Sequence, residues 1–268
     1  MRIKKYLSLK PVIKHERTLK KSHSLVSLVI RTKNEERWIS SCLDAVFKQS
    51  YKNFEVIIVD NESTDKTVDI ADQYPIKKIT YISNYLPSKA LNQGINCSQG
   101  KYVVCLSAHC IPTGPEWLVT LVKAIEEDEL YAGVYGRQEP MSITSPADKR
   151  DLLLVFGLDR KVQQKDSFFH NANSILRRDL WEEVPFDDTI TNIEDRIWAQ
   201  EMLKGGYKIL YEPDASVFHY HGIHHDNDDS RMSNTINIIE KINKGDMNEY
   251  GKIDPQKTKI ISIIPHVG

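Results

Sequence analysis

The sequence lacks any long hydrophobic run. No stretch of apolar residues approaches the about 20 that a helix needs to cross a bilayer. The first residues are basic, and they are not followed by the apolar core of a signal peptide. These absences argue against a helical membrane-spanning protein and predict a cytoplasmic one.

Cysteine is also scarce. The 268 residues include four, Cys42, Cys97, Cys105 and Cys110. No two of them have the Cys-x-x-Cys spacing of a zinc site, and nothing in their placement indicates a disulfide framework. Cys42 and Cys105 stand within apolar helical and strand patterns, so we interpret them as small core residues. Reduced thiols are the expected state.

The chain has almost no net charge, −1 at pH 7, but the charge is unevenly distributed. Residues 1–21 contain eight Lys or Arg and one Glu, so residues 1–24 form a basic leader and the remainder is acidic. Such a leader can bind the anionic inner face of a membrane, with about 1 kcal/mol from each basic residue. A solvated tail is the alternative. An acidic body without a basic stripe argues against nucleic acid as a partner.

The first half of the chain alternates between β-rich runs and helical patterns. The predicted strands are residues 25–30, 54–59, 77–82 and 102–106, and the predicted helices are residues 36–49, 65–74, 88–97 and 116–127. The run 54–59 is continuously apolar, which is typical of a parallel strand covered on both faces. This rhythm predicts right-handed βαβ units and an α/β fold with an open, mostly parallel sheet flanked by helices.

The rhythm changes after Gly133. A strand-like run at 134–140 precedes a loop-rich stretch that extends to about residue 167. Short strands are expected near 168–170 and 174–176, a helix at 193–204 that ends at Gly205-Gly206, strands at 207–211 and 215–219, and a helix at 234–244. The predicted organisation is a leader at 1–24, a domain at 25–222 with halves 25–112 and 113–222, and a helical extension at 223–268.

Polar residues follow the predicted strands. The first strand leads into Arg31-Thr32-Lys33-Asn34-Glu35, the second into Asp60-Asn61, and the fourth into Ser107-Ala108-His109. Ligands of parallel sheets bind beyond the carboxyl ends of the strands. Asp60 and His109 should therefore lie in one cleft.

With these motifs, residues 25–220 resemble the family 2 glycosyltransferases of the GT-A fold. Residues 132–140 resemble the rhamnosyltransferase-like branch of that family. The resemblance implies a GT-A fold in which 25–112 is a Rossmann-like, nucleotide-binding half and 113–222 an acceptor half. It also implies that the donor is a nucleotide-sugar, with a UDP- or dTDP-sugar expected.

The resemblance implies a set of donor contacts. Asp60 would accept a hydrogen bond from the imide N–H of uracil or thymine, and a helix-capping role is its alternative. Lys89 would meet a phosphate or the base, or else lie in solvent. The whole predicted donor set is Arg31, Thr32, Asn34, Glu35, Asp60, Asn61, Lys89, Ser107, Ala108, His109, Arg137 and Gln138.

The sequence also lacks the Asp-x-Asp that holds a divalent cation in most of this family, and carries Ser107-Ala108-His109 there. His109 stands at the second ligand position, and the resemblance implies His219 as a further ligand. Imidazole suits Mn²⁺ better than Mg²⁺, which prefers oxygen ligands. Three outcomes stay open: a divalent-cation site (Mn or Mg), a metal-free site in which Lys89, Arg137 or protonated His109 neutralises the diphosphate, or an inactive site.

Glu194-Asp195 opens the predicted helix 193–204. It corresponds to the family's Glu-Asp pair, whose Asp is the catalytic base in inverting members. Carboxylates at a helix N-terminus are also favoured by the helix dipole alone. Trp198, three residues further on, is predicted either to stack on an acceptor sugar or to pack in the core.

The leading hypothesis is therefore an inverting glycosyltransferase that acts on a glycan or lipid-linked acceptor, a precursor of a surface glycan. The rival is a non-catalytic nucleotide-sugar- or glycan-binding module that assists a partner enzyme. A sugar nucleotidyltransferase fits poorly because residues 31–37 contain no glycine for a phosphate-binding loop. Residues 259–265 faintly resemble the first strand of a cytidylyltransferase, which suggests one part of a larger protein.

Overall fold

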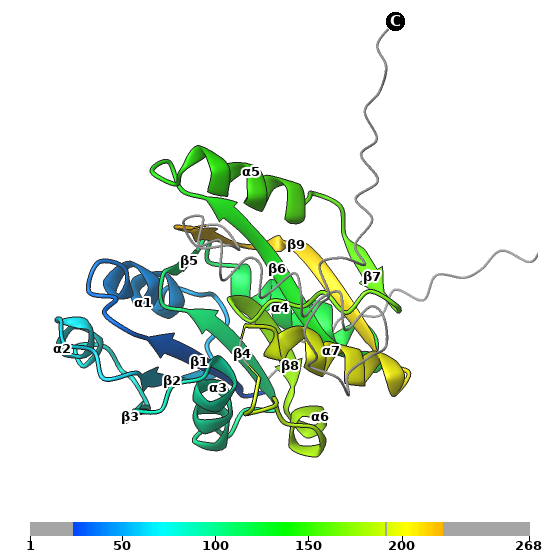
Figure 1. The fold of residues 1–268 in the computed structure, drawn as a ribbon, viewed down its shortest axis with the longest axis horizontal. Helices are drawn as coiled ribbons and strands as arrows, with labels where there is room; N and C mark the ends of the chain where they lie inside the picture. Colours follow the sequence, from blue (N-terminus) through cyan, green and yellow to red (C-terminus); the bar gives the residue numbers. More distant parts are fainter. Residues whose placement is uncertain (1–23, 191, 222–268) are drawn as a thin grey trace, which may run out of the picture.

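A computed structural model describes residues 24–190 and 192–221 (Figure 1). Its centre is one nine-stranded sheet with the order β3-β2-β1-β4-β8-β6-β9-β5, and β7 pairs with β9 beside this path. The strands are β1 (Val26–Thr32), β2 (Phe54–Asp60), β3 (Lys78–Tyr81), β4 (Tyr102–Ser107), β5 (Cys110–Pro112), β6 (Tyr131–Pro140), β7 (Lys161–Gln163), β8 (Asn173–Arg177) and β9 (Lys208–His219). The helices are α1 (Ile39–Phe47), α2 (Thr67–Ala71), α3 (Pro87–Asn96), α4 (Trp117–Glu126), α5 (Pro146–Val155), α6 (Arg178–Glu183) and α7 (Glu194–Lys204).

The central strand β1 is buried on both faces, as the continuous apolar pattern requires. Leu28 and Ile30 point into a core that includes residues of α1, α2 and α4. Val29 points to the other side, into a core that includes residues of α3, α6 and α7. Successive side chains of a strand alternate between its two faces, so one apolar strand serves both layers.

The prediction for the first half of the sheet is confirmed. Strands β3, β2, β1 and β4 are parallel neighbours, joined by helical crossovers. In the second half the sheet is mixed, because β8 runs antiparallel to both β4 and β6 while β9 runs parallel to β6.

Several predicted details of the second half are wrong. The predicted loop up to residue 167 contains α5 and β7, residues 168–170 form no strand, and the two predicted final strands are one continuous strand, β9. Helix α5 has a start signal: the Ser145 hydroxyl accepts a hydrogen bond from the Asp148 N–H, and Pro146 occupies the first turn. Its apolar side chains Leu153 and Leu154 are exposed while Leu152 is buried, so the apolar residues of this helix do not mark a single face.

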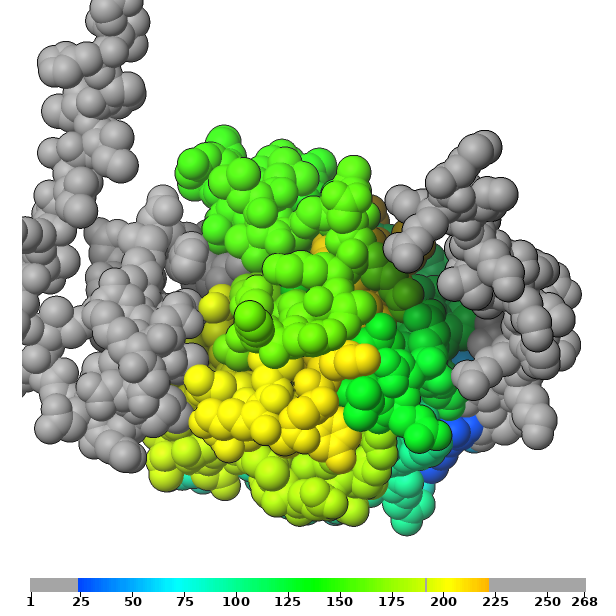
Figure 2. All heavy atoms as spheres, turned by 90° about the vertical axis from the view of Figure 1, so that its right-hand side faces the viewer, coloured from blue at the N-terminus to red at the C-terminus, as the bar shows by residue number. Residues whose placement is uncertain are grey.

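The predicted end of α7 is confirmed, because Lys204 is its last residue and Gly206 adopts the left-handed conformation, with φ of +85°. In Figure 2 the segment around α5, in green, lies above α7, in yellow. Within the described ranges, no helix is both long and apolar enough to span a bilayer. Residues 1–23 of the predicted leader, the predicted helix 234–244 and the extension 223–268 lie outside the described residues.

Candidate active site

The carboxyl ends of β1, β2 and β4 meet at one edge of the sheet. Thr32 is in register with Asp60, and Arg31 is in register with Ser107. The polar segments that follow these strands are therefore neighbours, as expected at the carboxyl ends of adjacent parallel strands.

Asp60 holds two of these segments together. Its carboxylate accepts hydrogen bonds from the Thr32 hydroxyl at 2.6 Å, from the Ser63 N–H at 2.7 Å and from the Ser63 hydroxyl at 2.6 Å. Both Asp60 and Thr32 are buried, at 0% and 3% exposure. A carboxylate has about four acceptor sites, and three of them serve the protein itself. Asp60 and Thr32 therefore form a clamp between the two loops. The predicted contact of Asp60 with the donor base stays a prediction, because these hydrogen bonds do not fill every acceptor site of the carboxylate.

The loops after β1 and β2 are further tied by their own polar groups. The Asn34 side-chain oxygen accepts from the Thr64 N–H at 2.8 Å, and the Asn34 N–H donates to the Ser63 hydroxyl at 2.8 Å. Lys33 donates to the carbonyl of Asn61 at 2.6 Å. The predicted donor residues Asn34 and Asn61 thus lie on two loops that hydrogen bonds hold together. The Asn34 side chain makes one of these bonds.

A pair of carboxylates lies at the start of α7. Glu194 and Asp195 are 4% and 8% exposed. Asp195 accepts from the N–H of Asn171 at 3.1 Å and from the N–H of Arg196 at 2.8 Å. Glu194 lies 3.7 Å from the guanidinium of Arg31, at the end of β1. The Arg31 side chain therefore connects α7 to the strand-end loops, a link that no sequence pattern indicated.

Burial raises the pKa of both carboxyl groups. The pKa of Glu194 rises to about 7, mainly because the group is removed from water and secondly because Asp195 is close, while Arg31 opposes the rise. The pKa of Asp195 also lies above its ordinary value because of burial, against the hydrogen bond from the Asn171 N–H. Carboxylates with raised pKa values are better proton acceptors near neutral pH.

This pKa makes the stability of the protein dependent on pH. Between pH 4.5 and about 7 the folded state keeps the Glu194 proton while the unfolded state has lost it, so the free energy of unfolding falls as pH rises. A change from 4.5 to about 7 corresponds to about 3 kcal/mol. We expect Glu194→Gln to remove this dependence on pH. From pH 4 to pH 8, the free energy of unfolding of the variant should therefore rise by about 3 kcal/mol relative to that of wild type.

Urea denaturation across this pH range measures the difference. Glu201→Gln is the matched control, because Glu201 lies on the same helix but is exposed and pairs with Lys204. Equal pH slopes for Glu194→Gln and wild type would show that Glu194 is ionised throughout the range.

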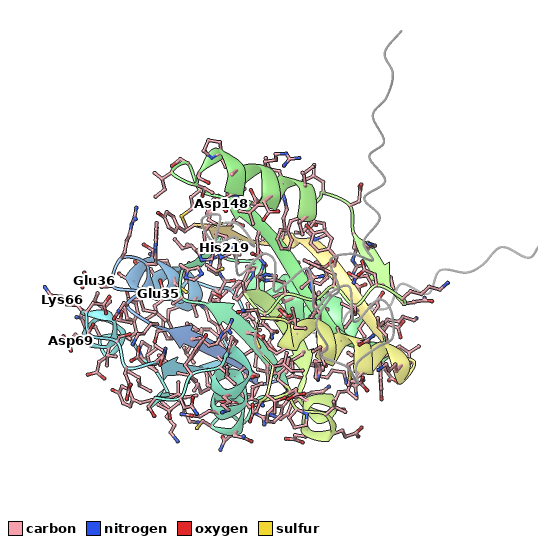
Figure 3. All side chains as sticks on the ribbon, in the orientation of Figure 1. Glu35, Glu36, Lys66, Asp69, Asp148 and His219 are labelled. Carbon is pink, nitrogen blue, oxygen red and sulfur yellow. The ribbon has the colours of Figure 1, made fainter. Side chains whose placement is uncertain are left out.

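Three histidines converge beside the carboxyl ends of β6 and β9. His109 precedes β5, His219 ends β9, and His221 follows it. Their potential ligand atoms all lie within 4.8 Å of one another. His109 Nδ1 lies 2.7 Å from a carboxylate oxygen of Glu35, on the loop after β1. Figure 3 labels Glu35 and His219. The predicted pair His109 and His219 is therefore brought together, with Glu35 beside it.

The sequence analysis did not assign His221 to this group. The signal was present, since His219 and His221 alternate in an extended run and such residues point the same way. The resemblance implies a divalent cation, and the chemistry of these donors determines which cation fits. Three imidazoles fit a transition metal such as Mn²⁺ or Zn²⁺, whereas Mg²⁺ prefers a set of oxygen ligands.

Lys89 lines a groove of about 570 Å³ between the end of β3 and α3. Tyr81, Asn84 and Asp188 also line it. The Ile82 N–H, just after β3, donates to the Asp60 carbonyl, so this groove lies at the same edge of the sheet as the clamp. Lys89 is thus available to a ligand at the strand ends.

Arg137 and Gln138 lie on β6. The Arg137 guanidinium is 3.4 Å from Glu139, and its side chain is 19% exposed. Gln138 is 1% exposed, and its amide lies 3.0 Å from a ring nitrogen of His170. Gln138 is therefore an internal residue, which corrects its prediction as a direct contact of the donor sugar.

Trp198 is a core residue. It is 1% exposed and packs between Phe169 and Phe186, with ring centroids 5.6 Å and 6.0 Å away. No face of the indole is open to a sugar ring, so the core alternative holds and the acceptor contact is wrong.

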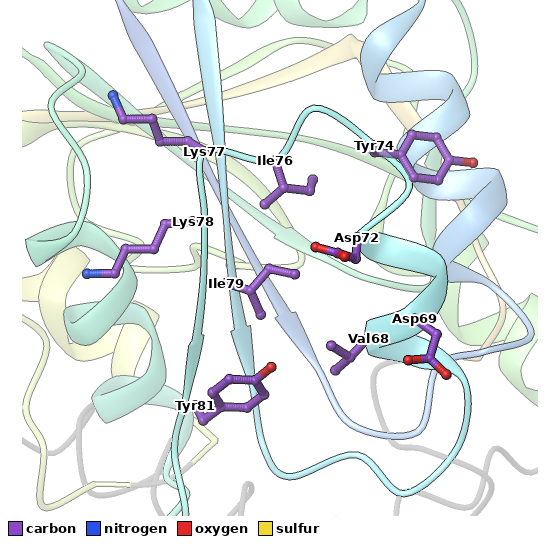
Figure 4. Close-up of a pocket in the computed structure, with 9 residues that line it drawn as sticks. All are labelled: Val68, Asp69, Asp72, Tyr74, Ile76, Lys77, Lys78, Ile79 and Tyr81. Atoms are coloured by element: carbon purple, nitrogen blue, oxygen red, sulfur yellow. The ribbon is translucent and has the colours of Figure 1, made fainter.

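A second cavity shares Tyr81 with the groove that Lys89 lines. It has a volume of about 370 Å³ between α2 and the outer strand β3 (Figure 4). Its lining mixes Val68 and Ile79 with Asp72 and Lys77, and it contains none of the predicted site residues.

Comparison with known families matches residues 27–184 to Glycosyl transferase family 2. A dolichyl N-acetyl-alpha-D-glucosaminyl phosphate 3-beta-D-2,3-diacetamido-2,3-dideoxy-beta-D-glucuronosyltransferase of Methanococcus voltae is 26% identical over 74% of this chain and 67% of its own length. The O-antigen chain rhamnosyltransferase RfbN of Salmonella typhimurium is 27% identical over 73% of this chain and 66% of its own.

Solved structures share the fold. The mannosyltransferase PcManGT of Pyrobaculum calidifontis, in complex with GDP-Man and Mn²⁺, superposes with a TM-score of 0.63 and 22% identity, over 86% of this chain and 66% of the other. S. aureus TarS in complex with UDP-GlcNAc superposes with a TM-score of 0.58 and 18% sequence identity, over 73% of this chain and 58% of the other. This chain thus spans about two thirds of the length of several of these proteins. The match over more than half of the sequence, carried by a GT-A sheet with its polar strand ends together, makes this chain a member of glycosyl transferase family 2.

Proposed function

We propose that this protein transfers a sugar from a UDP- or dTDP-sugar to a hydroxyl group of a surface-glycan precursor, with inversion at the anomeric carbon. The observation that supports this most is the position of Asp195. It is a buried carboxylate with a raised pKa, and its neighbour Glu194 reaches Arg31 at the carboxyl edge of the parallel strands. A nucleotide-sugar bound at that edge would have this carboxylate nearby.

Asp195 would act as the general base. It would take the proton of the acceptor hydroxyl while the hydroxyl oxygen attacks the anomeric carbon and the nucleoside diphosphate leaves with the bonding electrons. The raised pKa of Asp195 favours proton acceptance near neutral pH. Glu194 would keep Arg31 and the start of α7 in place.

The donor would lie along the loops after β1, β2 and β4. Its diphosphate would face Lys89, Arg137 and the three convergent histidines. Its base would lie against the loops that carry Asn34 and Asn61. A base that reaches the Asp60 carboxylate would have to share it with Thr32 and Ser63, which already donate to it. A divalent cation held by His109, His219 and His221 would neutralise charge on the diphosphate.

The acceptor side is inferred from chemistry and from relatives. RfbN is named as an O-antigen chain rhamnosyltransferase, and the Methanococcus protein as an enzyme that acts on a dolichyl phosphate sugar. These names support the rhamnosyltransferase-like branch and a lipid-linked acceptor. The basic segment 1–24 would then hold the protein at the anionic membrane face where such an acceptor resides.

The test is a transfer assay with purified protein. UDP- and dTDP-sugars are supplied with a lipid-linked glycan acceptor, and release of the nucleoside diphosphate is followed together with the anomeric configuration of the product by NMR. Transfer with inversion is expected. Retention of configuration would refute the mechanism. Binding of a donor without transfer or hydrolysis would favour the alternative, a non-catalytic binding module. The missing Asp-x-Asp is the observation that supports this alternative.

A further inference from the structure

The histidine cluster consists of His109, His219 and His221. Pairing of β5 with β9 builds it, since Cys110 is in register with His219 and His109 directly precedes Cys110. The ring centroids of His109 and His219 are 5.1 Å apart, and His221 lies 4.6 Å and 4.5 Å from them. His219 is buried, and His109 and His221 are half-buried. Three imidazoles from two segments therefore converge on one point.

Glu35 fixes the ring of His109. The Nδ1 of His109 lies 2.7 Å from a carboxylate oxygen of Glu35, and the tautomer that places the ring proton on Nδ1 donates it to that carboxylate. In the neutral imidazole the lone pair then resides on Nε2. A carboxylate that accepts from one ring nitrogen while the other binds an ion is the usual partner of a metal-bound histidine.

The chemistry of the donors distinguishes between cations. Mg²⁺ demands oxygen ligands in near-octahedral geometry, and none of the three convergent side chains supplies oxygen. Imidazole nitrogen suits Zn²⁺, Cu²⁺, Ni²⁺ and Fe²⁺, and affinity for a given nitrogen site rises from Mn²⁺ through Co²⁺. Three protein ligands are also the number found where a fourth position is left for a substrate oxygen.

We propose that His109, His219 and His221 form a transition-metal site that binds Zn²⁺ or Co²⁺ more tightly than Mn²⁺ and does not bind Mg²⁺. The absence of the two Asp-x-Asp carboxylates would then change which cation the site prefers, from one that needs oxygen ligands to one that imidazole nitrogens bind. This inference deepens the proposed function, and rests on it for the role of the cation against the diphosphate. The binding itself is measured without donor or acceptor.

The experiment uses the full chain with any affinity tag of histidines removed. Isothermal titration calorimetry and thermal unfolding are carried out with ZnCl₂, CoCl₂, MnCl₂ and MgCl₂ after treatment with a chelator. One equivalent of Zn²⁺ or Co²⁺ should bind and raise the unfolding temperature, because an ion that binds only the folded state stabilises it. Bound Co²⁺ should also give the visible absorption of a nitrogen-ligated ion.

Two kinds of variant locate the site. His221→Ala and His221→Gln remove one ligand at a half-buried position, and each should weaken Zn²⁺ binding at least tenfold. Glu35→Gln keeps the three ligands and should weaken it by about 10- to 100-fold, the usual effect of losing a metal ligand's hydrogen-bond partner. The control is the double variant His224→Ala, His225→Ala, which should bind as wild type does.

The outcomes separate cleanly. Equal binding of Mg²⁺ and Zn²⁺, unchanged Zn²⁺ binding in both His221 variants, or loss of binding in the His224, His225 control would overturn the assignment. Asp195→Asn should still bind Zn²⁺ with wild-type affinity while the rate of transfer falls by about 10²- to 10⁴-fold. A failure of the proposed reaction is thus distinguishable from a failure of the metal site. Circular dichroism of each metal-free variant verifies its fold.

Discussion

Replacing Asp195 with Asn should reduce the rate of sugar transfer by about 10²- to 10⁴-fold, the usual contribution of a positioned general base. Asn has nearly the same shape as Asp but accepts no proton from an acceptor hydroxyl. In the structure Asp195 accepts hydrogen bonds from the N–H groups of Asn171 and Arg196. The Asn side chain has one oxygen left to accept either of them, so a small loss of stability is also expected.

The measurement is kcat with a saturating donor, together with the Kd of the donor. The base assignment requires kcat to fall while donor affinity stays within a few-fold of wild type. Asp179→Asn is the control, since Asp179 is an exposed residue of α6 that pairs with Arg177. A rate for Asp195→Asn within threefold of wild type would remove Asp195 from the reaction.

Replacing Gly136 with Ala should cost about 3 kcal/mol or more of folding stability. A Cβ at this position would overlap the carbonyl oxygen of Ala215 and the side-chain amide of Asn173. Asn173 cannot retreat, because it donates to the carbonyls of Arg137 and Ala215 and accepts from the Trp117 indole. Overpacking usually costs about 1–3 kcal/mol, and here the obstacle includes backbone.

Urea unfolding of Gly136→Ala measures this loss. Gly114→Ala and Gly157→Ala are the matched controls, since a Cβ at either position meets nothing within 4 Å. Their stability should stay within about 0.5 kcal/mol of wild type, as is usual for surface substitutions. If Gly136→Ala is as stable as these two, β6 and β9 separate at this position at little cost, and the close packing around Gly136 does not limit the stability of the protein.

The parallel half of the fold was predictable because its signals are local. Strand β2 is continuously apolar, and α4 buries Trp117, Leu118 and Leu121 at helical spacing. Helix α5 was missed because its exposed face carries Leu153 and Leu154, which blurs the contrast between a buried and a solvated side. Strand β9 was split in two because Pro213 and Asp214 disfavour a strand, yet β6 accommodates them with a register shift between Gly136 and Gln138.

The grouping of the strand-end residues was predictable from the sequence, but their contacts were less so. Strand ends place Asp60, His109 and Glu35 together, and topology alone gives that result. Whether a side chain faces a ligand or its own protein depends on neighbours from distant segments. Ser63 and Thr32 donate hydrogen bonds to the Asp60 carboxylate, and Phe169 and Phe186 pack against Trp198. Such partners leave no periodic trace in the sequence.

The pairing of β5 with β9 has a consequence for biosynthesis. Cys110 and His219 become neighbours although more than a hundred residues separate them along the chain. The three imidazoles can therefore meet only after the ribosome has released the end of β9, when the parallel strands β1, β2 and β4 are already available to fold. The proposed cation would therefore bind late in folding, and a chain that ends before β9 would lack two of its three ligands, His219 and His221.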